Sequence, residues 1–255
     1  QSGETPPTGG NGDQHTGEVK SGGDPINLFT GAFTMQVTDL RIPGRGIDFV
    51  WSRSYDSNIT YLDSELGTTW SSPYFARLVD VDQNGNAGNV DYKDGRGRVD
   101  RFTYSAPNWT SPAHHYLELT LNGGTSEFVV KGDGDLEHRF HDFTHASAPG
   151  RLSGIRDRFG NQISFQYGPT GLLTGATDTY GRAFTFTHNA EGLLTGVTDF
   201  SGRTVTYAYY SFDDSAGLPG DLKSATSPVV TGHPYGNNFP LGKTTVYAYN
   251  RFHAD

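Results

Sequence analysis

The chain has 255 residues, of which 34 are Gly, 13% are aromatic, one is Met and none is Cys. This mixture of turn formers and strand formers predicts an all-β fold with little helix, and the absence of Cys excludes disulfides and thiolate metal sites. The formal net charge of −9 argues against nucleic acid and anionic membranes as partners, and no apolar run reaches the length of a membrane span.

The N-terminal segment 1–23 is rich in Gly, Ser, Thr, Pro and Asn and holds almost no large apolar side chain. Such a segment buries too little surface to offset the entropy of ordering, so residues 1–23 are predicted to form a flexible arm. The chain starts at Gln1 rather than Met, which we interpret as the mark of a processed or excised chain, and we expect a secreted protein at the cell surface or outside the cell.

Short runs of alternating apolar and polar residues follow between residues 24 and 149. Alternation with period two predicts strands, and Asn-Gly or Asp-Gly pairs between the runs predict hairpin turns. These pairs are Asn84-Gly85, Asp94-Gly95, Asn122-Gly123 and Asp133-Gly134. Residues 24–149 are therefore predicted to be a β module of antiparallel hairpins.

An internal repeat begins near residue 150, and its constant period is marked by Gly154, Gly175 and Gly196. Each repeat has an Asp three residues before a Gly, and an Arg or Asn directly after that Gly. This fixed order favours Asp residues that cap turns over Asp residues that together bind a cation or substrate. A fourth copy follows the third at a longer spacing, which inserts near 211–217 and 228–240 explain. The repeated turn positions are Asp157, Gly160, Asp178, Gly181, Arg182, Asp199, Gly202, Arg203 and Gly242.

An alternating strand with aromatic residues on one face and mostly Thr on the other follows each repeated turn. Large aromatic residues at equivalent positions of stacked repeats indicate a shared core, and a sugar-stacking row is the alternative interpretation. The aromatic positions are Phe165, Tyr167, Phe184, Phe186, Tyr207, Tyr209, Tyr247 and Tyr249.

The pattern Asp-x-x-Gly-Arg, an aromatic-x-aromatic strand and Gly-Leu-Leu-Thr-Gly resembles the YD repeat of Rhs and teneurin-like proteins. The earlier motifs Asp24-Pro25-Ile26-Asn27, Ile42-Pro43-Gly44-Arg45-Gly46 and Asp94-Gly95-Arg96-Gly97 resemble the module that opens the repeat region in bacterial Rhs and wall-associated proteins. The resemblance implies an N-terminal Rhs-type module at 24–149 and about four degenerate YD repeats at 150–255. It also implies a spiralling antiparallel sheet that forms an open or partly closed shell.

One segment has the ligand order of a calcium loop, with oxygen-bearing side chains at Asp80, Asp82, Asn84, Asn86 and Asp91. The competing interpretation is a strand at 77–81 that ends in an Asn84-Gly85 hairpin turn, because no helices are predicted beside it. No cofactor is expected, unless this loop binds calcium. His138, His141 and His145 could bind zinc together on a helix, but the alternation around them predicts a strand.

No motif for catalysis is found. His114-His115 and the scattered Ser and Asp residues lack a nucleophile elbow or a comparable local pattern, so no catalytic residue is assigned and the chain is not expected to be an enzyme. Asn58-x-Thr60 and Asn108-x-Thr110 match the N-glycosylation sequon, which matters only in a host that adds such glycans.

These patterns favour an extracellular structural scaffold that assembles with copies of itself into a filament or a shell wall. The last strand, at 244–249, is expected to leave an unpaired sheet edge that the first strand near 27–37 or the arm of another copy could cover. One alternative is a carbohydrate-binding adhesion module that uses residues 233–238 and an exposed Trp51, Trp70 or Trp109. Another alternative is a fragment of a larger Rhs toxin-delivery protein.

Overall fold

The computed structural model describes residues 31–60, 64–113, 116–132, 134, 136–232, 234–236 and 238–249. Within them nearly all regular structure is antiparallel β-sheet, interrupted by the 3-10 turns η1 (Pro73–Phe75) and η2 (Gly85–Ala87). The prediction of an all-β fold is therefore confirmed. The arm at 1–23 and the motif at 24–27 lie outside the described residues.

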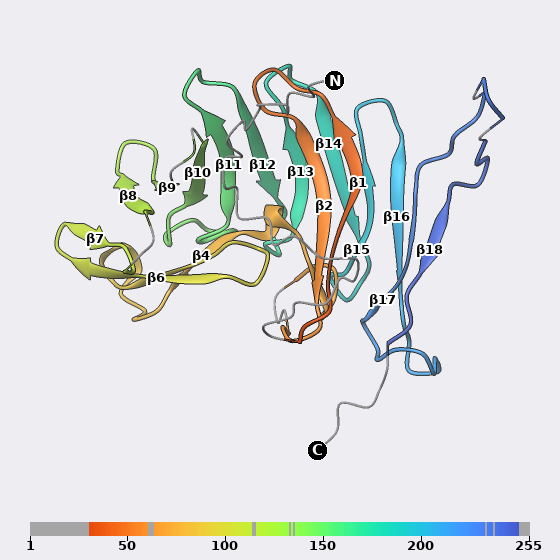
Figure 1. Ribbon diagram of the computed structural model, residues 1–255. Helices are drawn as coiled ribbons and strands as arrows, with labels where there is room; N and C mark the ends of the chain where they lie inside the picture. Colours follow the sequence, from red (N-terminus) through yellow and green to blue (C-terminus); the bar gives the residue numbers. More distant parts are fainter. Residues whose placement is uncertain are drawn as a thin grey trace, which may run out of the picture.

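An open sheet of eleven strands forms the body of the molecule, and each strand pairs antiparallel with its neighbour in the chain (Figure 1). The strands at its two ends, β8 and β18, do not pair with each other, so the sheet does not close. Its strands are β8 (Glu118–Asn122), β9 (Glu127–Lys131), β10 (Leu136–His141), β11 (Leu152–Asp157), β12 (Gln162–Tyr167), β13 (Leu173–Thr177), β14 (Ala183–His188), β15 (Leu194–Thr198), β16 (Thr204–Tyr209), β17 (Leu222–Thr226) and β18 (Thr244–Val246).

The N-terminal part forms two smaller sheets. β1 (Thr34–Ile42), β2 (Phe49–Asp56) and β3 (Trp70–Ser71) make the first, which lies across the strands β13 to β15 in Figure 1. The second holds β4 (Arg77–Asp80), β5 (Val90–Lys93), β6 (Val99–Ser105) and β7 (Asn108–Thr110). The long sheet begins at β8, so it continues without a break across residue 150, where the sequence repeat begins.

The sequence repeat is also a structural repeat. The hairpins β12–β13, β14–β15 and β16–β17 each carry a register shift at the same place, just before Tyr167, His188 and Tyr209. Gly175 and Gly196 lie on the outer face, where they pair with Thr185 and Thr206. The same side chain pattern therefore produces the same backbone in successive units.

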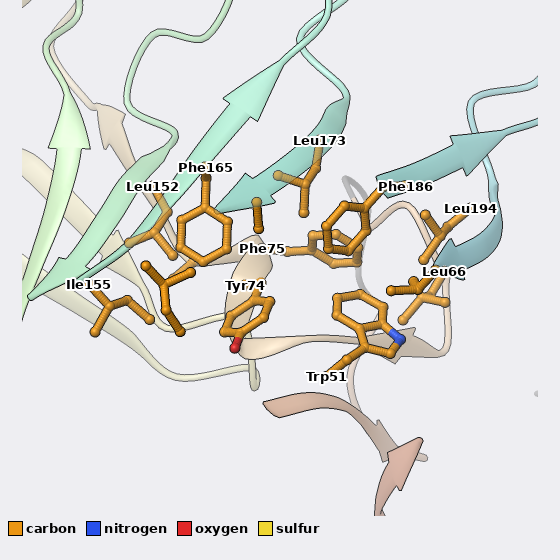
Figure 2. Packing of buried hydrophobic residues seen from close by; sticks show 14 of the residues in the cluster. Trp51, Leu66, Tyr74, Phe75, Leu152, Ile155, Phe165, Leu173, Phe186 and Leu194 are labelled. Atoms are coloured by element: carbon orange, nitrogen blue, oxygen red, sulfur yellow. The ribbon is translucent and has the colours of Figure 1, made fainter. Parts of the chain in front are cut away.

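The core lies between the inner face of the long sheet and the N-terminal strands, as Figure 2 shows. Phe49 stacks on Phe184 with ring centroids 3.6 Å apart, and Trp51 meets Phe186 edge to face at 5.3 Å. The aromatic face of the repeats is thus buried by non-repeating residues of β2 and η1. Among the described residues, no helix has the length and apolar character needed to cross a membrane.

Candidate functional site

The repeated Asp-x-x-Gly turns are closed by one carboxylate each. In the turn at 178–182, one Asp178 carboxylate oxygen accepts hydrogen bonds from the backbone N–H groups of Tyr180 and Arg182, and the other accepts one from Arg182 Nε at 2.7 Å. Gly181 has a φ of +76°, a conformation that L side chains rarely adopt. Each of these polar groups therefore finds its partner within the same turn.

The other two turns are built in the same way. Asp199 binds the N–H groups of Ser201 and Arg203 together with the Arg203 guanidinium, and Asp157 binds Asn161 through both its backbone and its side chain. The hydrogen bond from the Asn161 side chain lowers the pKa of Asp157. Burial acts to raise the pKa of Asp199, but the hydrogen bonds from Ser201 and Arg203 outweigh it, so that pKa is lowered too. Gly242 repeats the positive φ, at +75°.

The repeat aromatics point to the inner face. Phe165, Phe184, Phe186 and Tyr207 are at most 5% exposed, which places them in the core. Tyr167, Tyr209 and Tyr247 pack against this core and are partly buried, as is Tyr249. Because their rings are covered by β2 and η1, the row does not form an open platform for sugar stacking.

A buried ion pair that we did not predict from the sequence joins the N-terminal strands to the repeats. The Arg53 guanidinium is 1% exposed and donates to the carboxylate of Asp39, whose other interactions include a hydrogen bond of 2.6 Å from the Tyr207 hydroxyl. Trp51 Nε1 donates to the same hydroxyl, and Arg53 also donates to the hydroxyl of Tyr247. We call these five residues the arginine cluster.

Aromatic rings surround the cation of the arginine cluster. The Arg53 guanidinium carbon lies 4.7 Å from the Trp70 ring centroid and 5.4 Å from that of Tyr207. Burial acts to lower the pKa of Arg53, but its hydrogen bonds to Asp39 outweigh this effect and raise it, so the cation persists at every accessible pH. Burial next to the Asp39 charge raises the pKa of Tyr207 well above its ordinary value.

Two features place the arginine cluster, and one of them is a sequence signal. Phe49, Trp51 and Arg53 alternate, so the side chain of Arg53 shares the apolar face of its strand. Asp39 sits where the β1–β2 register shifts between Thr38 and Leu40, and a bulge re-aims a side chain. The alternation was visible in the sequence, but the bulge was not.

A second buried pair, also missed from the sequence, fastens the segment before β3 to the repeats. The Glu65 carboxylate lies 2.7 Å from His188 Nε2, and both side chains are less than a tenth exposed. The other Glu65 oxygen accepts from the Leu173 N–H, and the Glu65 carbonyl accepts from the Leu194 N–H at 2.6 Å. Glu65 thus contacts two successive repeats at one end of their strands.

The predicted calcium residues lie around the β4–β5 loop, but they have protein partners. Asp80 accepts from the backbone N–H groups of Asn84 and Gly85, while Asp82 accepts from that of Asn89. The side chain of Asn86 binds Asp142. Asp91 is ion-paired with Arg101. Calcium at this loop stays a prediction, and a chelator that lowers the unfolding midpoint would support it.

The histidines and tryptophans lie as follows. His138 and His141 are on strand β10, and the His141 ring stacks on that of His145 at 3.9 Å. Within the described ranges no group of three or more His, Asp, Glu or Cys could hold a metal ion. Trp51 and Trp70 are at most 1% exposed, so the expectation that they are exposed is wrong, because both fill the core. His114 and His115 lie outside the described residues.

Two of the cavities among the described residues open at the surface. The first, of about 150 Å³, is lined by Arg77, Lys93, Arg98 and Ser71 between the N-terminal sheets. The second is a groove of about 640 Å³ beside the insert at 211–217, lined among others by Glu191, Thr195, Tyr210 and Phe212.

Comparison with known proteins adds two matches. Residues 148–183 match the family described as RHS Repeat, and residues 23–102 match a Domain of unknown function (DUF6531). No curated protein matches the chain. This match supports the predicted resemblance of the turns at Asp157 and Asp178 to the Rhs-type repeat. The teneurin-like resemblance and the assignment of 24–149 as an N-terminal Rhs module stay predictions.

Proposed function

On the premise that residues 148–183 carry an RHS repeat, we propose that this chain is an extracellular structural scaffold. Its N-terminal strands line the inner face of the repeat sheet, and the sheet grows by addition of strands at β18. The observation that supports this role most directly is that the long sheet is covered on its face but not at its end. Its inner face is covered by β1–β3 and the arginine cluster, whereas β18 is the last strand in the strand order. A role as part of a larger toxin-delivery protein stays a prediction.

The geometry of β18 suits strand addition. The Tyr247 N–H donates to the Lys223 carbonyl and the Lys243 carbonyl accepts from the Ser227 N–H, so odd-numbered residues of this strand face β17. In an antiparallel pair, the backbone groups of the even-numbered residues point away from the partner strand. The N–H and C=O of Val246 therefore point away from β17, toward the free edge of the sheet. All three residues of β18 are exposed. Such an edge is a template for a further strand.

The complementary edge in a second copy is β8, the strand at the far end of the same sheet. Pairing of β18 with β8 joins copies head to tail, and such contacts give open filaments unless the rotation happens to close a ring. The sequence predicts that the first strand near 27–37 or the arm at 1–23 of another copy covers this edge, and the arm lies outside the described residues. However, β1 belongs to the separate three-stranded sheet, so its pairing would not extend the repeat sheet.

A pair of proline variants tests this proposal. Val246→Pro removes an outward N–H and leaves the bonds to β17, whereas Thr245→Pro removes an N–H that faces β17. We expect light scattering and electron microscopy to detect assemblies of the parent chain that Val246→Pro abolishes without lowering the unfolding midpoint, while Thr245→Pro lowers that midpoint. A monomeric parent at high concentration, or a Val246→Pro variant that assembles as the parent does, would contradict the proposal.

One observation favours the carbohydrate-binding alternative, and it concerns the groove beside residues 211–217. Phe212 is 92% exposed at its border, and Glu191, Thr195 and Ser211 supply polar groups. An exposed ring flanked by oxygen-bearing side chains matches the two faces of a sugar. A glycan array should then detect binding that Phe212→Ala removes, and equal binding by the variant would exclude this groove.

A further inference from the structure

Large exposed apolar side chains gather at one end of the strands of the repeat sheet. The connections β11–β12, β13–β14, β15–β16 and β17–β18 all lie along the upper edge in Figure 1. We call this edge the turn rim and define it by six side chains that are 42% to 87% exposed: Phe159, Tyr180, Phe200, Val229, Phe239 and Leu241. A row of this kind on a polar surface marks an interaction site.

The repeat sets the geometry of the turn rim. Successive turns are two strands apart, which corresponds to a spacing of about 9.5 Å. The turns carry Phe159, Tyr180 and Phe200, and the insert between β17 and β18 continues the row with Val229, Phe239 and Leu241. Each of these side chains is at least 42% exposed, although Phe200 also meets the core residue Phe184 edge to face at 6.4 Å. Their exposure therefore calls for a partner.

The charge of the turn rim differs from that of the whole chain. The segments 156–162, 178–183, 199–204 and 227–243 contain five Arg or Lys and three Asp, a local balance of +2 in a chain whose formal net charge is −9. The three Asp residues are the turn aspartates, which are less than a tenth exposed and hydrogen-bonded within their own turns. Arg182 and Arg203 pair with Asp178 and Asp199, so the local balance of +2 comes from Arg156, Arg158 and Lys243 against Asp157.

Cations accompany the apolar tips along the chain. The guanidinium of Arg158 lies 4.7 Å from the Phe159 ring centroid, and that of Arg182 lies 4.9 Å from the ring of Phe200. Lys243 follows Leu241 by two residues and is exposed. Apolar tips with Arg or Lys beside them match the layering of a bilayer surface, where acyl chains lie beneath anionic phosphates.

We propose that the turn rim is a docking surface for a bilayer that carries anionic phospholipids. Aliphatic tips such as Val229 and Leu241 favour lipid over a polysaccharide, which stacks on aromatic rings but gains little from exposed Leu or Val. The negative net charge, which argued against anionic membranes, is an average over the chain, whereas a bilayer senses the charge within about one Debye length of its surface. The rim is made of side chains at the ends of the strands, whereas strand addition uses the backbone N–H and C=O groups of β18, so the two proposals use different groups of the chain.

Binding to vesicles tests the proposal. The whole chain is mixed with vesicles of phosphatidylcholine, with or without roughly 30 mol % phosphatidylserine, and the bound fraction is measured by cosedimentation. We expect binding to the anionic vesicles that weakens as salt is raised. Leu241→Asp should lower the partition coefficient about tenfold or more, because an inserted Leu side chain is replaced by a charge that the surface repels. Lys243→Gln should lower it about fivefold.

Leu218→Asp is the matched control. Leu218 is also exposed, at 59% against the 87% of Leu241, but it lies in the β16–β17 connection at the opposite ends of the strands. This variant should bind the anionic vesicles as the parent does. Absence of parent binding, equal binding to vesicles without phosphatidylserine, or an equal loss in Leu218→Asp would overturn the proposal. Dissociation of a parent oligomer by Leu241→Asp would also overturn it, because the rim would then join copies.

Discussion

The turns of the repeats and the arginine cluster satisfy buried charges in two different ways. In the turns, an Asp carboxylate meets groups of its own turn, as Asp178 meets Arg182. In the cluster, Asp39 meets Arg53 14 residues away and Tyr207 168 residues away. The network within a turn recurs in every repeat, whereas the arginine cluster occurs once. The repeats therefore supply the strands, and single long-range contacts determine what covers them.

Breaking the arginine cluster should lower the free energy of unfolding more than any other change described below. Asp39→Ala leaves the Arg53 cation buried without its carboxylate, and removal of one partner of a buried pair costs about 3 to 5 kcal/mol. Urea denaturation of the variant measures the loss in the free energy of unfolding. Tyr207→Phe, which removes only one hydroxyl, should cost about 1 to 2 kcal/mol. If Asp39→Ala costs under about 1 kcal/mol, the cluster does not fasten the two regions.

Changing a repeated turn should have a smaller effect. Gly181→Val forces a branched side chain into a positive φ, although a Cβ at this position meets no atom within 4 Å. The cost is therefore conformational and should be about 2 kcal/mol. Thr185→Val, on the exposed face of the next strand, should change stability by less than about 0.5 kcal/mol. Thermal or urea unfolding compares the two, and equal stabilities would show that the turn does not need Gly.

Lowering the pH should gradually weaken the hydrogen-bond networks of the repeated turns. The pKa values of Asp157 and Asp199 are lowered in the folded chain, so the unfolded chain binds more protons as the pH falls. Their contribution is complete above the unfolded pKa of about 3.9 and is lost as the pH falls through the lower folded values. The urea concentration at the unfolding midpoint should therefore decrease as the pH is lowered below about 3.9. Asp199→Asn should have a lower midpoint at neutral pH and a flatter acid dependence, and an unchanged dependence would contradict this account.

Sequence alone determined the features whose partners lie nearby in the chain. Turn chemistry and alternation act within a few residues, so the repeated Asp and Gly positions, the aromatic strands and the all-β class could be read directly. The same reasoning placed Phe184 and Tyr207 on one face. It could not say what covers that face, and it left Trp51 and Trp70 as candidates for an exposed binding site when both are buried.

Only the tertiary structure decided which distant residues meet. The pairing of Arg53 with Asp39 depends on a bulge in β1, and the contacts of Glu65 with His188 and Leu194 depend on how a loop crosses the ends of the repeat strands. The gathering of apolar tips at the turn rim likewise follows from the antiparallel order, which brings every second connection to the same edge. The contacts of Arg53 with Asp39 and of Glu65 with His188 leave no periodic signal, because each forms only once.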